Sequence, residues 1–276
     1  MANKIKKIRL DLYLVENGIF ESREKARIAI MEGNVFVNNQ KEDKPGTMIK
    51  EDSVVEYRGE KLKYVSRGGY KLEKAINEFN IDLKNKTCID IGSSTGGFTD
   101  CMLQNAAKKV FAVDCGTNQL DYKLRIDDRV VTMENTNARY LDKSNFDDET
   151  IDFISVDVSF ISLTKIIPGV NDLLKNDGEA IMLIKPQFEA GKELVEKNGV
   201  VRDSKTHIDV IKKVIEFSYN LGLSILRLDY SPIKGPAGNI EYLLYVKKSL
   251  DNVINEIDEN NIINLVNTSH VNLSGE

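Results

Sequence analysis

The sequence predicts an α/β fold, an open and mostly parallel sheet with helices on both faces, preceded by a small α+β domain. Three observations support this prediction. From Tyr70 to Lys248, apolar runs of strand length alternate with amphipathic runs of helix length, which is typical of a parallel sheet. The last two strands, 223–232 and 240–248, have no helix between them and should pair antiparallel. Before Tyr57, two short helices are followed by two short strands, which indicates a separate and smaller unit.

The first zone runs from about Ile8 to Tyr57 and is long enough to fold alone, at about 55 residues. Apolar side chains recur at helical spacing from Leu10 to Ile19, and Ser22 is a suitable N-cap for a second helix that stops at Gly33. Short strands are expected at 34–40 and 52–57, with turn residues at 44–46.

The patterns divide the chain into a small α+β domain (1–60), a linker (61–69), the α/β domain (70–250) and a C-terminal helix with a flexible tail (251–276). The linker has Gly68 and Gly69 to loosen it and Lys63 and Arg67 to keep it basic. Two interpretations stay open: a solvated linker, or a linker that faces nucleic acid.

Within the α/β domain, each element is expected from the period of its apolar residues. Strands are expected at 88–92, 109–116, 130–134, 151–160, 180–188, 223–232 and 240–248. Helices are expected at 71–79, 96–106, 118–127, 162–176 (with a break near Pro168) and 207–222, where Gly222 is the stop.

The composition is that of a globular protein, with 41% hydrophobic and 29% charged residues. No apolar run approaches the roughly 18 residues of a membrane span. Cys88, Cys101 and Cys115 have no C-x-x-C spacing and should be reduced thiols in a cytosolic protein. Two histidines are too few for a histidine-based metal site, so no metal is expected.

The formal net charge of -5 is distributed unevenly along the chain. The stretch from Met1 to Lys74 carries a net +4, Ala75 to Ser249 carries -4, and the last 27 residues carry five acids and no base. The basic excess therefore lies at the front, where contacts with phosphate would be useful.

A glycine-rich turn follows the first strand of the α/β domain, in the sequence CIDIGSSTGGFTD. Such a turn brings backbone close to a ligand and exposes the N–H groups of the next helix. A dinucleotide-binding protein uses the same plan, but Ser94 stands where its second glycine would admit the pyrophosphate. A ligand without phosphates, S-adenosylmethionine, fits better. The expected cofactor-binding residues in and after the turn are Asp90, Gly92, Ser93, Gly96, Gly97, Phe98 and, at the end of the next strand, Asp114.

Four polar residues are expected at the carboxyl edge of the sheet, where parallel sheets carry their active sites. Asp157 and Lys185 end two strands, and Glu241 opens the antiparallel last strand, whose start lies on the same edge. Lys71 lies on the helix before the first strand. Strand-end charges are often only solvated, yet two bases and two acids that converge on one edge favour a catalytic site.

In its K-D-K-E order of Lys71, Asp157, Lys185 and Glu241, the chain resembles the FtsJ-like ribose 2′-O-methyltransferases. Its first zone resembles the S4 RNA-binding domain in three segments: Arg9-Leu-Asp, Ser22-Arg-Glu-Lys-Ala and the strand NVFVN. The combination resembles the TlyA family, whose segments are matched by YVSRGGYKL, DIGSSTGGFTD, ENTNAR, DVSFISL, KPQFE, GVVRD and GPAGNIEYL. The match extends over nearly the whole chain.

The resemblance implies a Rossmann-like seven-stranded methyltransferase sheet and S-adenosylmethionine-dependent 2′-O-methylation of cytidine ribose in 16S or 23S ribosomal RNA, or both, within a ribosomal subunit. Asn137 stands where related enzymes often have an aspartate that contacts adenine. Lys185 should meet the ribose hydroxyl, either as a neutral amine that accepts its proton or as an ammonium that stabilises the alkoxide. The expected phosphate contacts are Arg9, Arg23, Lys25, Arg27 and Arg67.

Two other classes of function remain as alternatives. A non-catalytic RNA-binding or ribosome-binding factor would keep the S4-like zone but would not need the four charged residues, which are all present here. A membrane-active haemolysin, the label that members of this family have carried, is not favoured because the sequence has no span and no long amphipathic repeat.

Overall fold

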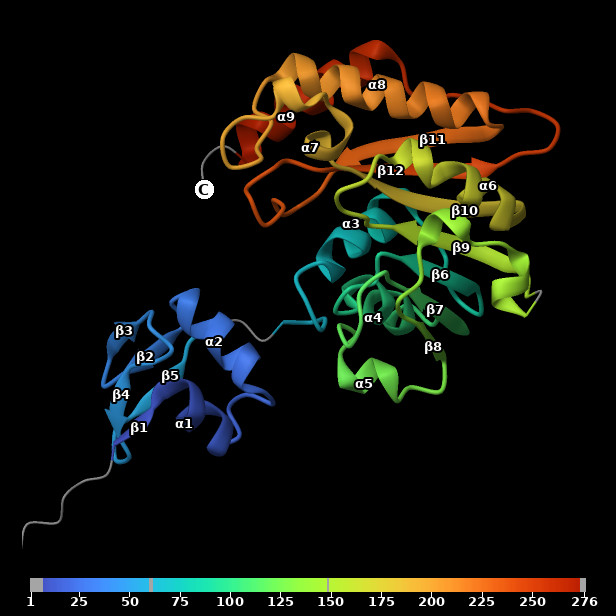
Figure 1. Ribbon diagram of the computed structural model, residues 1–276. Helices are drawn as coiled ribbons and strands as arrows, with labels where there is room; N and C mark the ends of the chain where they lie inside the picture. Colours follow the sequence, from blue (N-terminus) through green and yellow to red (C-terminus); the bar gives the residue numbers. More distant parts are fainter. Residues whose placement is uncertain (1–6, 60–61, 148, 274–276) are drawn as a thin grey trace, which may run out of the picture. The chain divides into compact units, whose positions relative to one another are not determined.

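The computed structural model describes residues 7–59, 62–147 and 149–273. It divides the chain into two compact units, Met1–Leu62 and Lys63–Glu276. Figure 1 labels the elements of both units.

The first unit packs two helices against two small sheets. Its helices are α1 (Leu10–Glu16) and α2 (Arg23–Met31), and its strands are β1 (Lys7–Arg9), β2 (Val35–Val37), β3 (Gln40–Glu42), β4 (Met48–Lys50) and β5 (Val55–Tyr57). β1 pairs with β4, and β2 lies between β3 and β5, all antiparallel. Leu10, Leu14 and Ile30 are fully buried in the core between the helices and strands.

The signals that predict the two helices agree with the structure, but three strands were not expected. The Ser22 hydroxyl accepts a hydrogen bond from Lys25 N, and Gly33 adopts a φ of 73° just after α2. Asn38 and Asn39 both have positive φ, which makes the tight turn from β2 to β3. β1, β3 and β4 have only three residues each, too few to show an alternating apolar pattern.

The second unit is a seven-stranded sheet between two layers of helices, which confirms the predicted fold class. The strand order is β11-β12-β10-β9-β6-β7-β8. Its strands are β6 (Thr87–Ile91), β7 (Lys109–Val113), β8 (Val130–Met133), β9 (Ile151–Val156), β10 (Leu174–Ile184), β11 (Leu223–Tyr230) and β12 (Tyr242–Lys248). Only β12 runs against its neighbours, pairing antiparallel with both β10 and β11.

The helices divide between the two faces of this sheet, as Figure 1 shows. Apolar residues of α6 (Ile167–Leu173), α8 (Ser204–Asn220) and α9 (Glu259–Leu273) form one core with the sheet, and those of α3 (Gly69–Phe79), α4 (Gly97–Gln104) and α5 (Tyr122–Arg125) form the other. The remaining short elements are α7 (Pro186–Glu189) and the 3₁₀ turns η1 (Ala138–Tyr140), η2 (Lys143–Phe146), η3 (Leu163–Lys165) and η4 (Lys192–Leu194). Strands covered on both faces explain the continuous apolar runs of the sequence.

Several elements end earlier than their patterns predict. The helix expected at 118–127 is the single turn α5, and the strand expected at 151–160 stops at Val156. The helix expected at 162–176 is interrupted near Pro168, as predicted: a 3₁₀ turn at 163–165 ends before α6 begins at Ile167, and Pro168 occupies the first turn of α6, where its missing N–H is not needed.

Part of the stretch expected to be a linker packs within the second unit, and the expected C-terminal helix is present. Tyr64, within the stretch 61–69 expected to be a linker, is only 2% exposed and packs in the core with α3 and α4. Beyond residue 250, the expected helix is α9, which has 15 residues and buries Ile262, Val266 and Leu273, while residues 274–276 of the expected tail lie outside the described residues. Among the residues that the structure describes, no helix has both the length and the apolar character needed to cross a membrane.

Candidate active site

The four predicted charged residues lie together at the carboxyl edge of the sheet. Asp157 directly follows β9 and Lys185 directly follows β10, and these strands are parallel neighbours. Glu241 precedes β12, whose first residue pairs with the last residue of β10. Lys71 comes from the first turn of α3.

Their charged groups form a row of alternating sign, which ends on a hydroxyl. Lys71 Nζ lies 2.7 Å from Glu241 Oε2 and 3.5 Å from Asp157 Oδ2. Lys185 Nζ lies 2.5 Å from Asp157 Oδ1 and donates a hydrogen bond to Ser159 Oγ at 3.1 Å. Asp157 therefore contacts both lysines, one with each oxygen.

Burial distinguishes this row from solvated strand-end charges. The exposed fractions are 6% for Lys71, 8% for Lys185 and 1% for Glu241. Burial alone would lower the pKa of Lys71, but the Asp157 and Glu241 carboxylates outweigh it, so the pKa of Lys71 is raised and the side chain stays an ammonium. Gly235 packs closely against the Glu241 carboxylate, and a Cβ at this glycine would lie only 2.5 Å from Glu241 Oε1.

The glycines of the turn are required by close packing within the protein. A Cβ at Gly92, whose φ is 85°, would lie 2.4 Å from the Asp157 carbonyl oxygen. A Cβ at Gly96, with φ 94°, would meet Leu124, and one at Gly97 would meet Ser66. The sequence analysis explained these glycines by the close approach of a ligand. The structure adds that the turn packs directly against the backbone of Asp157.

Asp90 is fully buried, so it acts from beneath the turn. Its Oδ2 accepts hydrogen bonds from Thr99 N (2.9 Å) and Thr99 Oγ1 (2.7 Å), and its Oδ1 accepts one from Ser155 Oγ (2.9 Å). Burial raises the pKa of Asp90 to about 6, although the hydrogen bonds oppose the rise. Asp90 thus ties β6 to α4 and β9 directly beneath the glycine-rich turn.

The other predicted cofactor residues vary in exposure. Asp114 is half-buried, and its two carboxylate oxygens accept hydrogen bonds from Ser94 N (2.8 Å) and Gly116 N (2.7 Å). Phe98 is 4% exposed and lies in the core on the α3 and α4 side, and Ser93 is also buried. Asn137 is exposed, and its side chain caps η1.

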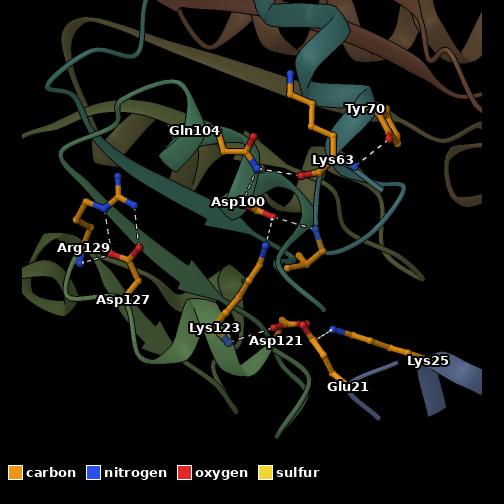
Figure 2. Close-up of polar contacts among 11 residues, drawn as sticks. Glu21, Lys25, Lys63, Tyr70, Asp100, Gln104, Asp121, Lys123, Asp127 and Arg129 are labelled. Carbon is orange, nitrogen blue, oxygen red and sulfur yellow. Dashed lines mark hydrogen bonds and ion pairs between the residues drawn. The ribbon is translucent and has the colours of Figure 1, made fainter. Parts of the chain in front are cut away.

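The segment that leads into α3 is fastened to α4 by polar contacts, which Figure 2 shows. Asp100 Oδ2 accepts a hydrogen bond from Val65 N (2.9 Å) and lies 3.1 Å from Lys123 Nζ. Gln104 Nε2 donates to the Lys63 carbonyl oxygen (3.1 Å) and to Asp100 Oδ1 (3.0 Å). The segment 63–69 is therefore part of the second unit, and only Arg67 of the predicted RNA contacts lies there, with its side chain exposed.

In the first unit, one buried carboxylate organises two predicted RNA contacts. Asp11 accepts hydrogen bonds from Arg9 Nε (3.0 Å), Arg9 Nη2 (2.9 Å) and Arg23 Nε (2.9 Å), and this bonding lowers the pKa of Asp11 to about 2. Lys25 forms an ion pair with Glu21 at 2.8 Å, also drawn in Figure 2. Arg27 is exposed on α2.

Asp11, Ser159 and Glu189 were not among the candidate site residues, although all three lie in segments that carry the family resemblance. Asp11 stands at a buried position of an apolar helix, so its isolated charge among Leu10, Leu12 and Leu14 was a usable signal. Ser159 and Glu189 carry no such signal, since their roles depend on contacts between distant segments. No group of three or more potential metal ligands occurs among residues 7–59, 62–147 and 149–273.

Comparison with known proteins agrees with this arrangement. The FtsJ-like methyltransferase family model matches residues 64–248, and the S4 domain model matches residues 8–55. The chain is 54% identical to "Putative rRNA methyltransferase YqxC" of Bacillus subtilis over 87% of its length and 86% of that protein's. It is 35% identical to the 16S/23S rRNA (cytidine-2′-O)-methyltransferase TlyA of Mycobacterium tuberculosis over 90% and 93%. A Streptococcus thermophilus structure titled "Putative hemolysin" superposes with a TM-score of 0.79 at 46% identity, covering 98% of each chain.

Proposed function

This chain belongs to the FtsJ-like methyltransferase family, and on that premise we propose that it methylates the 2′-hydroxyl of cytidine ribose in ribosomal RNA, with S-adenosylmethionine as methyl donor. The proposal takes its substrate from relatives such as TlyA of Mycobacterium tuberculosis. A single observation carries it for this chain: the buried row of alternating charges from Glu241 to Lys185 at the carboxyl edge of the sheet.

The cofactor fits the residues around the glycine-rich turn. Each oxygen of Asp114 accepts one backbone hydrogen bond, so each keeps a lone pair for a ribose hydroxyl. Ser94 and Thr95 are exposed between Gly92 and Gly96, and α4 begins directly after the turn. We propose that Asp114 and the turn hold the cofactor, that Asn137 lies at its adenine end, and that Asp90 and Phe98 support the turn from within the core.

When bound, S-adenosylmethionine supplies a methyl group on a positively charged sulfur. An oxygen nucleophile would take up the methyl group and the sulfur would leave as a neutral thioether. Lys185 is the group proposed to meet the ribose 2′-hydroxyl, as a proton acceptor or as an ammonium that stabilises the alkoxide. Asp157 and Ser159 hold the Lys185 amine from two sides. Glu241 holds Lys71, which contacts the second oxygen of Asp157, so the row positions Lys185 before substrate arrives.

The first unit is proposed to recruit the RNA, with Arg9, Arg23, Lys25 and Arg27 contacting phosphates and Arg67 contributing from the second unit. Asp11 fixes Arg9 and Arg23 without covering them, since both arginine side chains remain about half exposed, at 42% and 51%. A ribosomal subunit in the cytoplasm is the proposed setting.

The test is methylation of ribosomal RNA taken from cells that lack the gene, with purified protein and radiolabelled cofactor. Label should enter the RNA and be recovered, after digestion, as 2′-O-methylcytidine. Label on a nucleobase, or none in RNA or subunits from such cells, would contradict the proposed reaction.

A further inference from the structure

Two segments that carry the proposed catalytic residues lie side by side beyond the sheet edge. One is the loop 157–163 after β9, and the other is 185–189, which contains α7. They meet first where Lys185 contacts Asp157 and Ser159. The rings of Phe160 and Phe188 meet next, with centroids 5.0 Å apart.

At the far end of this pair of segments lies Glu189. Its Oε2 accepts a hydrogen bond from Ser162 Oγ and its Oε1 accepts one from Leu163 N, each at 2.6 Å. Both carboxylate oxygens are thus engaged by the loop that begins with Asp157. The Glu189 backbone is held in turn from α8, where Lys213 Nζ donates to its carbonyl oxygen at 3.2 Å.

Glu189 is 6% exposed, and burying a carboxylate is costly unless its hydrogen bonds are made. Burial accordingly raises the pKa of Glu189, while the bonds from Ser162 and Leu163 and the Lys213 charge oppose the rise. A buried acid with two loop donors ties that loop in place more firmly than an exposed one would.

The loop needs such a tie because its own conformation is strained. Phe160 has a φ of 63°, in the left-handed region that bulky residues rarely adopt, and its side chain is 91% exposed. α7 has only four residues and cannot hold a rigid position by itself. Strained conformations persist where surrounding contacts over-determine them.

We propose that Glu189 is a positioning residue, which locks the 157–163 loop against α7 and so keeps Asp157 and Ser159 in contact with the Lys185 amine. This inference rests on the proposed function for its consequence in catalysis, but the lock itself is a property of the fold. Glu189 acts through the loop and touches neither substrate nor cofactor.

The activity test measures methyl transfer to rRNA in single turnovers at saturating cofactor and RNA. Glu189→Ala should slow transfer by about 10- to 100-fold, the usual effect of a misplaced catalytic group. Cofactor affinity, measured by calorimetry, should stay within twofold, since Glu189 ends α7 and contacts α8 and the loop but not the glycine-rich turn. Glu189→Gln should keep most of the rate, because the amide can accept from Leu163 N–H and donate to Ser162 Oγ.

A matched pair of serine variants guards against misfolding as the explanation. Ser162→Ala removes one bond of the lock, of 2.6 Å, and Ser218→Ala removes a hydroxyl bond of 2.8 Å, to the Val214 carbonyl oxygen in α8. Ser162→Ala should slow transfer, whereas Ser218→Ala should not. In the Glu189→Ala background, Ser162→Ala should add little, since both remove the same contact.

A second readout does not depend on activity. The chain has no tryptophan, so Phe160→Trp introduces a single indole at an exposed position of the loop, and its fluorescence can be excited apart from that of the tyrosines. Adding Glu189→Ala should lower the indole's fluorescence anisotropy and increase its quenching by acrylamide, while Ser218→Ala changes neither.

The two readouts separate the inference from the proposed function. If the wild type methylates rRNA but Glu189→Ala and Ser162→Ala leave both rate and indole mobility unchanged, the lock is refuted. If the wild type transfers no methyl group to rRNA but Glu189→Ala still increases the mobility of the indole, the proposed function is refuted while the lock is supported.

Discussion

Asp157 is the residue on which the geometry of the site depends, because it is shared by two buried lysines. Its Oδ1 contacts Lys185 and its Oδ2 contacts Lys71. Asp157→Asn would leave Lys71 with the Glu241 carboxylate as its partner but would leave Lys185 without a carboxylate partner. A buried ammonium that loses its carboxylate is strongly disfavoured, so this change should disturb Lys185 more than Lys71.

Two substitutions of Lys185 should isolate chemistry from binding. Lys185→Ala should reduce the rate of methyl transfer by on the order of 10² to 10⁴, while cofactor and RNA affinities stay near wild type. Lys185→Arg keeps the charge but cannot lose its proton, so activity in this variant would favour the ammonium role and an inactive variant that binds normally the amine role. Lys74→Ala is the matched control, because Lys74 pairs with Asp229 outside the site. Normal turnover in all Lys185 variants would remove this residue from the mechanism.

Asp90 should impose a cost on stability at neutral pH. Its folded pKa is about 6 and its ordinary value is 3.8, so the native protein binds this proton more tightly than the unfolded chain. The difference corresponds to about 3 kcal/mol against the ionised native form, fully present above pH 6 and lost as the pH falls towards 4. Asp90→Asn should therefore be more stable than wild type at pH 7.5, and the gap should close near pH 4. Urea unfolding across this range measures it, and a gap independent of pH would contradict the assignment.

At the scale of elements, helix caps and glycine stops correctly predicted where helices begin and end, whereas the lengths of apolar runs did not predict where strands end. Ser22 and Gly222 mark the start of α2 and the end of α8 as expected, because both act through local backbone geometry. The end of a strand depends instead on its neighbours in the sheet, which explains why β9 stops before Asp157 although the apolar pattern continues to Phe160. The burial of the expected C-terminal helix could not be predicted for the same reason, since its buried residues pack against α8 and β11.

The docking of α9 gives a direct test at this scale. Ile262 is 3% exposed against the core under α8, so Ile262→Ala should lower the free energy of unfolding by about 2 to 5 kcal/mol. Val271, on the same helix, is 77% exposed, and Val271→Ala should stay within about 0.5 kcal/mol of wild type. Chemical unfolding of both variants distinguishes a packed helix from a loose tail, for which the two changes would have equally small effects.

At the scale of the whole molecule, the sheet and the convergence of Asp157, Lys185 and Glu241 could be predicted, because both follow from strand direction, whereas Lys71 lies on α3. Parallel strands bring their carboxyl ends to one edge whatever their exact lengths. The contacts that tie this edge together could not be predicted in the same way. Glu189 reaches a loop 26 residues earlier in the chain, and no local pattern marks that pairing.

The boundary between the two units leads to the last prediction. A chain that starts at Lys63 keeps Tyr64 in its core and the Val65 hydrogen bond to Asp100, whereas one that starts at Tyr70 loses both. The longer fragment should fold with a Tm close to that of this unit in the full chain and bind S-adenosylmethionine, and the shorter one should be less stable. Without Arg9, Arg23 and Arg27, however, the longer fragment should not methylate rRNA. In the full chain, Arg27→Glu should weaken RNA binding and flatten its dependence on salt, because fewer counterions are released. Calorimetry measures cofactor binding, thermal unfolding measures stability, and rRNA methylation measures activity, while RNA binding at several salt concentrations measures the effect of Arg27→Glu. Full rRNA methylation by the fragment from Lys63 would mean that the second unit recognises its RNA alone.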